Sequence, residues 1–420
     1  MACRGNLALN RTLRRRNSNC DGEVLLAATF KPVIFDKLPM HDTCWSITTG
    51  RDGLVYIGVC GEHIGGLSVF IASYNPETEQ VEYLCEVAPE LGEPPDNGRA
   101  THSKIHYCLL PGDDGLLYGA THCTGPPLGD PIWRPWNCWD DPIRRFSGFH
   151  FFIFDPATRK LEDLGVGSPN EGSRAMALDP HRRILYGVTY PRNHFYVYEV
   201  DQRRYHDLGR IGDLNPQAVF VDSEWNAYTT DDYGYLIRCR AGTLELETLD
   251  LQVPHAPFRN GWHNTLYDIE VSPDGRSFYG GGYGFDMRVF RFEPAEGRIT
   301  DFGRAYGEDD GDWRNLEHRS HIGGMVFGED GWLYYAVSLL HQEGPRLHLV
   351  KMHPETGERH DLGIITDGEK NSGYIAKATR DWFGNLYFAE SGLTPPRFWI
   401  YRPEGDWKPR PRWPLVRYWG

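Results

Sequence analysis

The chain has 420 residues, and its 58 Asp and Glu outnumber its 44 Lys and Arg, which gives a formal net charge of −14 at pH 7. This acidic balance argues against nucleic acid or an anionic membrane as partner, because both need a broad basic surface, but it leaves room for a local basic pocket. No run of 18 apolar residues is present, so we expect no transmembrane helix.

The N-terminal residues 1–22 are basic and lack an apolar core of signal-peptide length, so we expect a disordered leader there. The nine cysteines are irregularly spaced and form no CxxC pair. An odd count without regular spacing favours free thiols in a reducing compartment, and hence a cytoplasmic protein. A leader that is processed would instead allow a secreted or periplasmic protein.

A short aromatic strand recurs seven times along the chain. It begins at Gly53 (GLVYIGV), Gly115 (GLLYGAT), Arg183 (RILYGVT), Asn226 (NAYTTDD), Ser277 (SFYGGGY), Trp332 (WLYYAVS) and Asn385 (NLYFAES). An apolar strand and a tight turn precede each copy, as in IEVSPDGRSFY and MVFGEDGWLYY. Asp-Gly turns of this kind are typical of β-hairpins.

A Pro- or Gly-containing turn and a polar strand follow the first six copies. Clear examples begin at Asn75 (NPETEQVEYL), Asp155 (DPATRKLEDLG), Glu293 (EPAEGRITDFG) and His353 (HPETGERHDLG). The versions at Asp201 and Ala241 are degenerate, and the one at Arg402 is truncated. Each unit of about 50 residues therefore predicts four antiparallel strands, A to D, which is the pattern of a propeller blade.

These repeats predict an all-β fold, a seven-bladed β-propeller with four antiparallel strands per blade, as a single domain over residues 23–420. We expect the blades at 41–92, 98–167, 171–212, 213–257, 262–306, 318–366 and 371–410. A solenoid or two sandwiches would be the alternatives, but no linker divides the seven units. The last blade lacks a clear fourth strand, which either EVLLAATFKPVIF (Glu23 to Phe35) or the tail PRWPLVRYWG can supply.

One face of such a ring collects the starts of the A strands and the ends of the B strands, and functional residues concentrate on loops of this kind. Blade two stands out there, because its hairpin THSKIHYCLLPGDDGLLYGATHC has His102 near one end and His122 near the other. Since the two strands are antiparallel, we expect these two histidines to approach each other, with His106 facing the same way. His102, His106 and His122, with Cys123 nearby, also form an alternative metal site, although their spacing matches no standard zinc motif.

Other polar residues are expected on the same face. Blade three contributes Arg174, Tyr190 and Arg192, blade five His263 and blade six His321; further candidates are His41, Glu62, His63, Asp231, Asp232, Asn264, Tyr283, His318, Arg319, Tyr374 and Glu390. The long B–C loop of blade two adds Arg134, Arg144 and Arg145 among three Trp. Arginines beside aromatic rings suit an anionic sugar, since guanidinium groups pair with carboxylate or sulfate and rings stack on sugars.

The hairpin of blade two, followed by SRAMALDPHRRILYGVTYP in blade three, resembles the seven-bladed propeller polysaccharide lyases, and most closely the ulvan lyases. The resemblance implies a uronic-acid-containing, sulfated polysaccharide as substrate and β-elimination as reaction. It implies that His102, His122 and Tyr190 are catalytic and that Arg174 or Arg192 neutralises the uronate. His106, His263 and His321 are expected to bind substrate, and the long loop after His122 departs from the compact family pattern.

β-Elimination requires a cation on the carboxylate, a base for the C5 proton and an acid for the leaving O4. We expect an acidic polysaccharide or oligosaccharide as partner and no required cofactor, with a structural zinc or calcium ion as the alternative. Two other functions fit the same face. One is a non-catalytic propeller that binds glycans or proteins, and the other is a metal-dependent hydrolase or lactonase that uses the acids Asp231, Asp232, Glu62 and Glu390.

Overall fold

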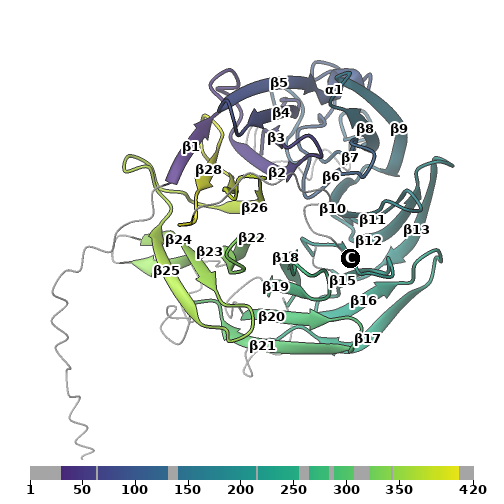
Figure 1. Cartoon of the computed structure of the whole chain (residues 1–420). Helices are drawn as coiled ribbons and strands as arrows, with labels where there is room; N and C mark the ends of the chain where they lie inside the picture. The colour runs from purple at the N-terminus through teal and green to yellow at the C-terminus, as the bar shows by residue number, and fades with distance from the viewer. Residues whose placement is uncertain are drawn as a thin grey trace, which may run out of the picture.

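The computed structural model describes residues 30–62, 65–130, 141–213, 216–254, 264–282, 288–306, 321–341 and 344–405. In these ranges the chain forms seven antiparallel sheets of four strands and a single short helix, α1 (Val87–Glu90). The sheets follow one another around a ring, as Figure 1 shows. The predicted seven-bladed β-propeller is therefore confirmed.

The first four blades occupy the N-terminal half of the ring. Blade one contains β2 (Thr43–Thr49), β3 (Val55–Cys60), β4 (Phe70–Asn75) and β5 (Gln80–Glu86). Blade two contains β6 (Leu109–Pro111), β7 (Leu117–Ala120), β8 (Gly148–Asp155) and β9 (Lys160–Pro169). Blade three contains β10 (Gly172–Asp179), β11 (Ile184–Tyr190), β12 (His194–Glu199) and β13 (Arg204–Arg210), and blade four β14 (Phe220–Val221), β15 (Ala227–Thr230), β16 (Tyr235–Cys239) and β17 (Leu246–Gln252).

The last three blades complete the ring. Blade five contains β18 (Leu266–Val271), β19 (Phe278–Gly282), β20 (Arg288–Glu293) and β21 (Arg298–Arg304). Blade six contains β22 (Ile322–Phe327), β23 (Leu333–His341), β24 (Gly344–Met352) and β25 (Arg359–Ile364), and blade seven β26 (Ile375–Arg380), β27 (Leu386–Glu390) and β28 (Arg397–Tyr401). Five of the seven blades fall inside the predicted limits; blade two runs two residues past 167, and blade seven takes its fourth strand from outside 371–410.

An N-terminal strand closes the ring. β1 (Phe30–Ile34) pairs antiparallel with β28 and is the outermost strand of blade seven, so the first and last strands lie side by side (Figure 1). Of the two closing segments predicted, the N-terminal one is thus correct in its described part, and the PRWPLVRYWG tail lies outside the described residues. The pairing of β1 with β28 joins an N-terminal and a C-terminal strand in one sheet and so gives blade seven its fourth strand.

The recurring aromatic strand has a structural reason. In five of the seven copies its tyrosine is buried and donates its hydroxyl to an aspartate in the preceding A–B turn, as between Tyr118 and Asp114 or Tyr334 and Asp330, both at 2.6 Å. In blade five the hydroxyl of Tyr279 donates to the Pro354 carbonyl instead. A buried tyrosine hydroxyl needs a partner, and the turn aspartate provides it. The outermost strands alternate between half-buried and exposed residues, which explains their polar sequences.

The start of blade two departs from the regular pattern. Residues 101–108 do not join the sheet as a continuous A strand, so β6 is shorter than predicted. Instead, Tyr107 exchanges backbone hydrogen bonds with blade three, donating to the Arg174 carbonyl and accepting from Met176. Within this segment Lys104, not His102, lies opposite His122 in an antiparallel bridge.

The six cysteines in the described ranges are buried free thiols, as expected: Cys44, Cys60, Cys85, Cys108, Cys123 and Cys239. In the same part of the chain, no helix is long and apolar enough to cross a membrane. The predicted leader at residues 1–22 lies outside the described residues.

Candidate functional site

Four of the predicted site residues come together where blades two and three meet. The rings of His106 and His122 lie 5.4 Å apart between centroids, and those of His122 and Tyr190 lie 5.1 Å apart. The guanidinium of Arg174 lies 4.8 Å from the centroid of the Tyr190 ring. We call His106, His122, Arg174 and Tyr190 the interblade cluster; it holds two imidazoles, a phenol and a cation.

The two histidines of this cluster are completely buried; among the described residues their ring nitrogens have no side-chain hydrogen-bond partner, and the peptide groups of Arg174 and Ser173 lie next to His106 and His122, respectively. Burial, together with the positive charges of Lys104 and Arg174, holds the pKa of both imidazoles well below the usual value. Both rings are therefore neutral at physiological pH. Two buried neutral imidazoles side by side, without a side-chain partner, make this place the candidate site.

Tyr190 is half-buried and covers His122 at the end of β11. Burial raises the pKa of its phenol, and the neighbouring Arg174 only partly opposes this effect. The phenol is thus protonated across the physiological range. The cluster combines a neutral imidazole, which can accept a proton, with a phenol that can donate one.

Arg174 brings a positive charge to the cluster. In the described part of the chain no carboxylate lies within ion-pair distance of its guanidinium, whose Nε has no hydrogen-bond partner. Arg192, the other candidate for binding an anion, is already paired, with 3.0 Å between its Nη1 and the Oε1 of Glu171. Of the two arginines between which the sequence did not decide, Arg174 is therefore the one with an unneutralised charge.

Gly172 makes room for His122. It lies opposite Tyr190 in the β10–β11 ladder, and a Cβ at this position would come within 2.0 Å of the His122 Nδ1. No other residue type fits without moving the imidazole. The close approach of strand and ring fixes His122 beneath Tyr190.

An ion pair and several aromatic rings lie next to the interblade cluster and contact it through His106. The buried Lys104 bonds to the Glu62 carboxylate and lies 3.5 Å from the centroid of the Trp45 ring. Trp45 contacts His106 at 4.6 Å and Tyr374 at 5.6 Å between centroids. His321 stacks on Tyr374 at 4.1 Å, but a peptide carbonyl already engages its Nε2, and burial lowers its pKa to about 4.

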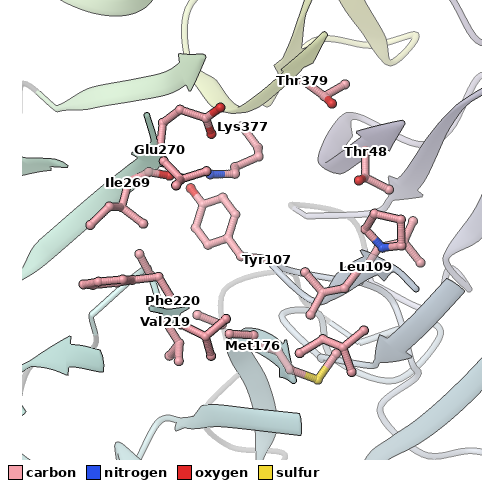
Figure 2. Close-up of a pocket in the computed structure, with 18 of the residues that line it drawn as sticks. Thr48, Tyr107, Leu109, Met176, Val219, Phe220, Ile269, Glu270, Lys377 and Thr379 are labelled. Atoms are coloured by element: carbon pink, nitrogen blue, oxygen red, sulfur yellow. The ribbon is translucent and has the colours of Figure 1, made fainter. Parts of the chain in front are cut away.

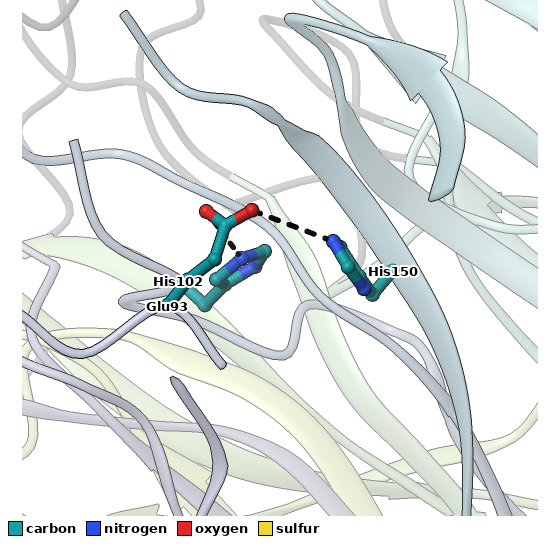
Figure 3. Close-up of side chains that lie close together, drawn as sticks. All are labelled: Glu93, His102 and His150. Atoms are coloured by element: carbon teal, nitrogen blue, oxygen red, sulfur yellow. Dashed lines mark ion pairs between the residues drawn. The ribbon is translucent and has the colours of Figure 1, made fainter. Parts of the chain in front are cut away.

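His102 lies apart from the interblade cluster, contrary to the expectation that it would approach His122. Its ring contacts Phe146 and His150, and its Nε2 faces the Glu93 carboxylate at 3.3 Å (Figure 3). The reason is the irregular start of blade two, where the residue opposite His122 is Lys104. A catalytic role for His102 stays a prediction from the resemblance.

Most of the remaining polar candidates have structural partners. The His41 ring bonds to the Ser68 carbonyl, Asp231 and Asp232 accept from turn or connector N–H groups, Asn264 bonds to the Val253 carbonyl, and Glu390 accepts from Ser372 and Trp399. Arg144 pairs with Asp130, and the backbone N–H of Arg145 bonds to the Asp141 carbonyl. His63, Arg134, His263, Tyr283, His318 and Arg319 lie outside the described residues.

The four acids suggested for a metal-dependent hydrolase do not form a cluster among the described residues. Glu62 is paired with Lys104, Asp231 and Asp232 serve turns and a connector, and Glu390 is in blade seven. Across the described ranges, the one group of three residues with ligand atoms close enough to share a metal is Glu93, His102 and His150. His106, His122 and Cys123 are not part of it.

A cavity of 350 Å³ occupies the other end of the channel, at the far ends of the A strands. Apolar side chains such as Leu109, Met176 and Phe220 dominate its wall, as Figure 2 shows. Lys377 and Asp268 in its wall neutralise each other in an ion pair, with 2.6 Å between Lys377 Nζ and Asp268 Oδ1. The cavity therefore offers less chemistry than the interblade cluster, from which Tyr107 separates it.

Sequence reasoning missed several residues that shape these sites. Glu93 lies in the connector after blade one, where nothing in the sequence marks it. Gly172 and Lys104 gain their importance only from what lies opposite them. His150 carried a signal that was overlooked: a basic residue on strand C and an aspartate 13 positions later on strand D recur at His150–Asp163, His194–Asp207, Arg288–Asp301 and His348–Asp361.

No family model and no curated protein matches the chain. Among solved structures, the extracellular domain of BT4673 from B. thetaiotaomicron is similar with a TM-score of 0.58 and 15% identity over 90% of the chain, which spans 40% of that domain's length. The RRP9 WD40 repeats give a TM-score of 0.56 and 11% identity, covering 90% of this chain and 98% of that one. A chain of the mitotic checkpoint complex gives 0.54 and 10%, covering 96% and 98%. At these identities the likeness extends to the propeller fold alone.

Proposed function

We propose that the chain is a polysaccharide lyase that cleaves a uronic-acid-containing polysaccharide or oligosaccharide by β-elimination. The observation that carries the proposal is the interblade cluster, where an arginine without a carboxylate partner lies against a protonated tyrosine and a buried neutral histidine. The sequence resemblance to the propeller lyases supports the same reaction. A sulfated, ulvan-like substrate rests on that resemblance only.

Arg174 is assigned to the uronate carboxylate. The C5 proton of a uronate is weakly acidic, and abstraction places negative charge on the carboxylate as an enolate-like state forms. A guanidinium suits this charge because it donates two parallel hydrogen bonds to a carboxylate. Burial of its surroundings strengthens the interaction relative to water.

The two proton transfers are assigned by charge state. The neutral His122 takes the C5 proton, and the protonated Tyr190 gives its proton to O4 as the C4–O4 bond breaks and the C4–C5 double bond forms. Tyr190 covers His122 in the free protein, so this assignment requires the substrate to open the contact between the two rings. His106, beneath His122, is assigned to positioning.

The direct test is ultraviolet absorbance of the unsaturated uronate during incubation with ulvan, glycosaminoglycans, pectins, alginate and their oligosaccharides. A rise with one of them, abolished in His122→Ala, supports the proposal and names the substrate class. Binding of one of these glycans without any rise would favour a non-catalytic binding propeller instead.

The pH profile of kcat/KM should be unusually broad. Elimination needs a neutral His122 and a protonated Tyr190. The pKa of His122 is lowered from 6.5 and that of Tyr190 is raised from 10.0. We therefore expect kcat/KM to stay constant from well below pH 6.5 to above pH 10. The acid limb, where His122 gains a proton, is expected below the usual histidine range. Initial rates in overlapping buffers would measure it, and a limb centred near pH 6.5 would contradict the assignment.

Gly172→Ala should lower kcat on the order of 100-fold, because the added methyl displaces His122 from Tyr190 and small misplacements of catalytic groups are costly. Gly282→Ala is the matched control, since a Cβ there meets no atom within 4 Å. Initial rates and circular dichroism of both variants would be compared. Full activity of a folded Gly172→Ala protein would argue against His122.

A further inference from the structure

We propose that Glu93, His102 and His150 bind a divalent transition-metal ion of the zinc class, at a site separate from the interblade cluster. Figure 3 shows both imidazoles directed at the same carboxylate. The three ligand atoms all lie within 4.8 Å of one another. The proposal does not depend on the elimination reaction.

The distances suit one bound ion. His102 Nε2 lies 3.3 Å from Glu93 Oε2, and His150 Nε2 lies 3.7 Å from Glu93 Oε1. Ligand atoms held about 2.0–2.2 Å from a tetrahedral zinc ion are about 3.3–3.6 Å apart. The two distances are near this range but end on different oxygens of the carboxylate, so small side-chain rotations are needed to bring one oxygen and both imidazoles onto an ion. Water would complete the coordination.

The two Nε2 atoms are available for a metal. Both histidines are at least nine-tenths buried, and the Nε2 atom of each faces the Glu93 carboxylate, the third proposed ligand. The other ring nitrogens are engaged: His102 Nδ1 with the Thr121 hydroxyl at 2.9 Å and His150 Nδ1 with Asp163 at 3.0 Å. Imidazoles that bind metals are usually held in this way through their second nitrogen.

The charge balance also favours a cation. Glu93 and Asp163 place two carboxylates around the histidines, and within the described ranges neither forms an ion pair with Lys or Arg. A divalent ion bound between them would offset this charge.

Blade two differs from the other blades at this point. The His–Asp pair recurs at His194–Asp207 in blade three, where its distance is also 2.9–3.0 Å, so the pair alone is an element of the blade repeat. Only in blade two, among the described residues, do a second histidine and a glutamate join it. Glu93 follows blade one, so the ion would connect that segment to blade two, next to Thr121 and the catalytic candidate His122.

Zinc binding to the purified, chelator-treated full chain tests the proposal. We expect one equivalent of Zn²⁺ to bind and to raise the melting temperature, since a ligand of the folded state stabilises it. Ca²⁺ should not, because two imidazoles suit zinc and not calcium. Co²⁺ should give visible d–d bands without a thiolate charge-transfer band.

Three variants locate the ion. Glu93→Gln and His150→Gln should each weaken zinc binding by more than about 100-fold. In both, the glutamine side chain is about as large as the one it replaces, so the fold should be kept. Asp163→Asn should weaken zinc binding by about 10–100-fold. His194→Gln removes the equivalent histidine of blade three and should bind zinc as the unaltered chain does. Near-ultraviolet circular dichroism checks that each variant is folded.

Three results would overturn the proposal. They are the absence of stoichiometric zinc binding by the unaltered chain, unchanged binding by Glu93→Gln and His150→Gln, and a thiolate band with Co²⁺, which would place the ion on cysteine. Because the first and third use the unaltered chain, the proposal stays testable if a variant fails to fold.

Discussion

Tyr190→Phe should lower kcat about 10²–10⁴-fold while leaving substrate binding nearly intact, because it removes one oxygen atom and with it the proton donor for O4. The phenyl ring keeps the contacts of Tyr190 with His122 and Arg174, which are 5.1 and 4.8 Å from its centroid. The fold should therefore be preserved. Initial rates of unsaturated-uronate formation measure the effect, and isothermal titration with an oligosaccharide measures binding.

Tyr198→Phe is the matched control for this variant. Tyr198 lies in the same blade, and its hydroxyl donates to the Leu164 carbonyl at 2.6 Å, so its loss should cost about 1 kcal/mol of stability and no catalysis. Near-full activity of Tyr190→Phe would refute its role as the acid. Equal loss of activity in both variants would indicate a structural effect.

Arg174→Gln should lower kcat/KM by about 10²–10³-fold, the loss typical for removal of one group that stabilises developing charge. The substitution removes the one positive charge of the interblade cluster and leaves the carboxylate of the substrate unneutralised at C5. Arg174→Lys should recover only part of the rate, because an ammonium group cannot form the two parallel bonds of a guanidinium. Steady-state kinetics of both variants on the same uronate oligosaccharide would measure this.

Arg192→Gln decides between the two arginines. Arg192 is exposed and paired with the buried Glu171, so its loss should affect stability more than turnover. A large loss of kcat/KM in Arg192→Gln, with little change in Arg174→Gln, would transfer the carboxylate-binding role to Arg192. Comparable melting temperatures would show that the kinetic difference is not one of folding.

The sequence by itself determined the propeller, the number of blades and their approximate positions in the chain. Each blade repeats local signals, such as the A–B turn with its aspartate and the buried tyrosine after it, and local signals can be read without knowing the neighbours. It also named as candidates the four residues that the structure brings together, His106, His122, Arg174 and Tyr190.

The tertiary structure alone decided which of these residues meet. Tyr107 bonds to the backbone of blade three, so residues 101–108 leave the regular ladder, Lys104 replaces His102 opposite His122, and His102 turns toward Glu93. Arg192 is neutralised by Glu171, whereas Arg174 forms no ion pair among the described residues. Such contacts join residues of different blades or connectors. Which residues meet depends on how neighbouring sheets pack against each other, and the sequence of a single repeat does not encode that packing.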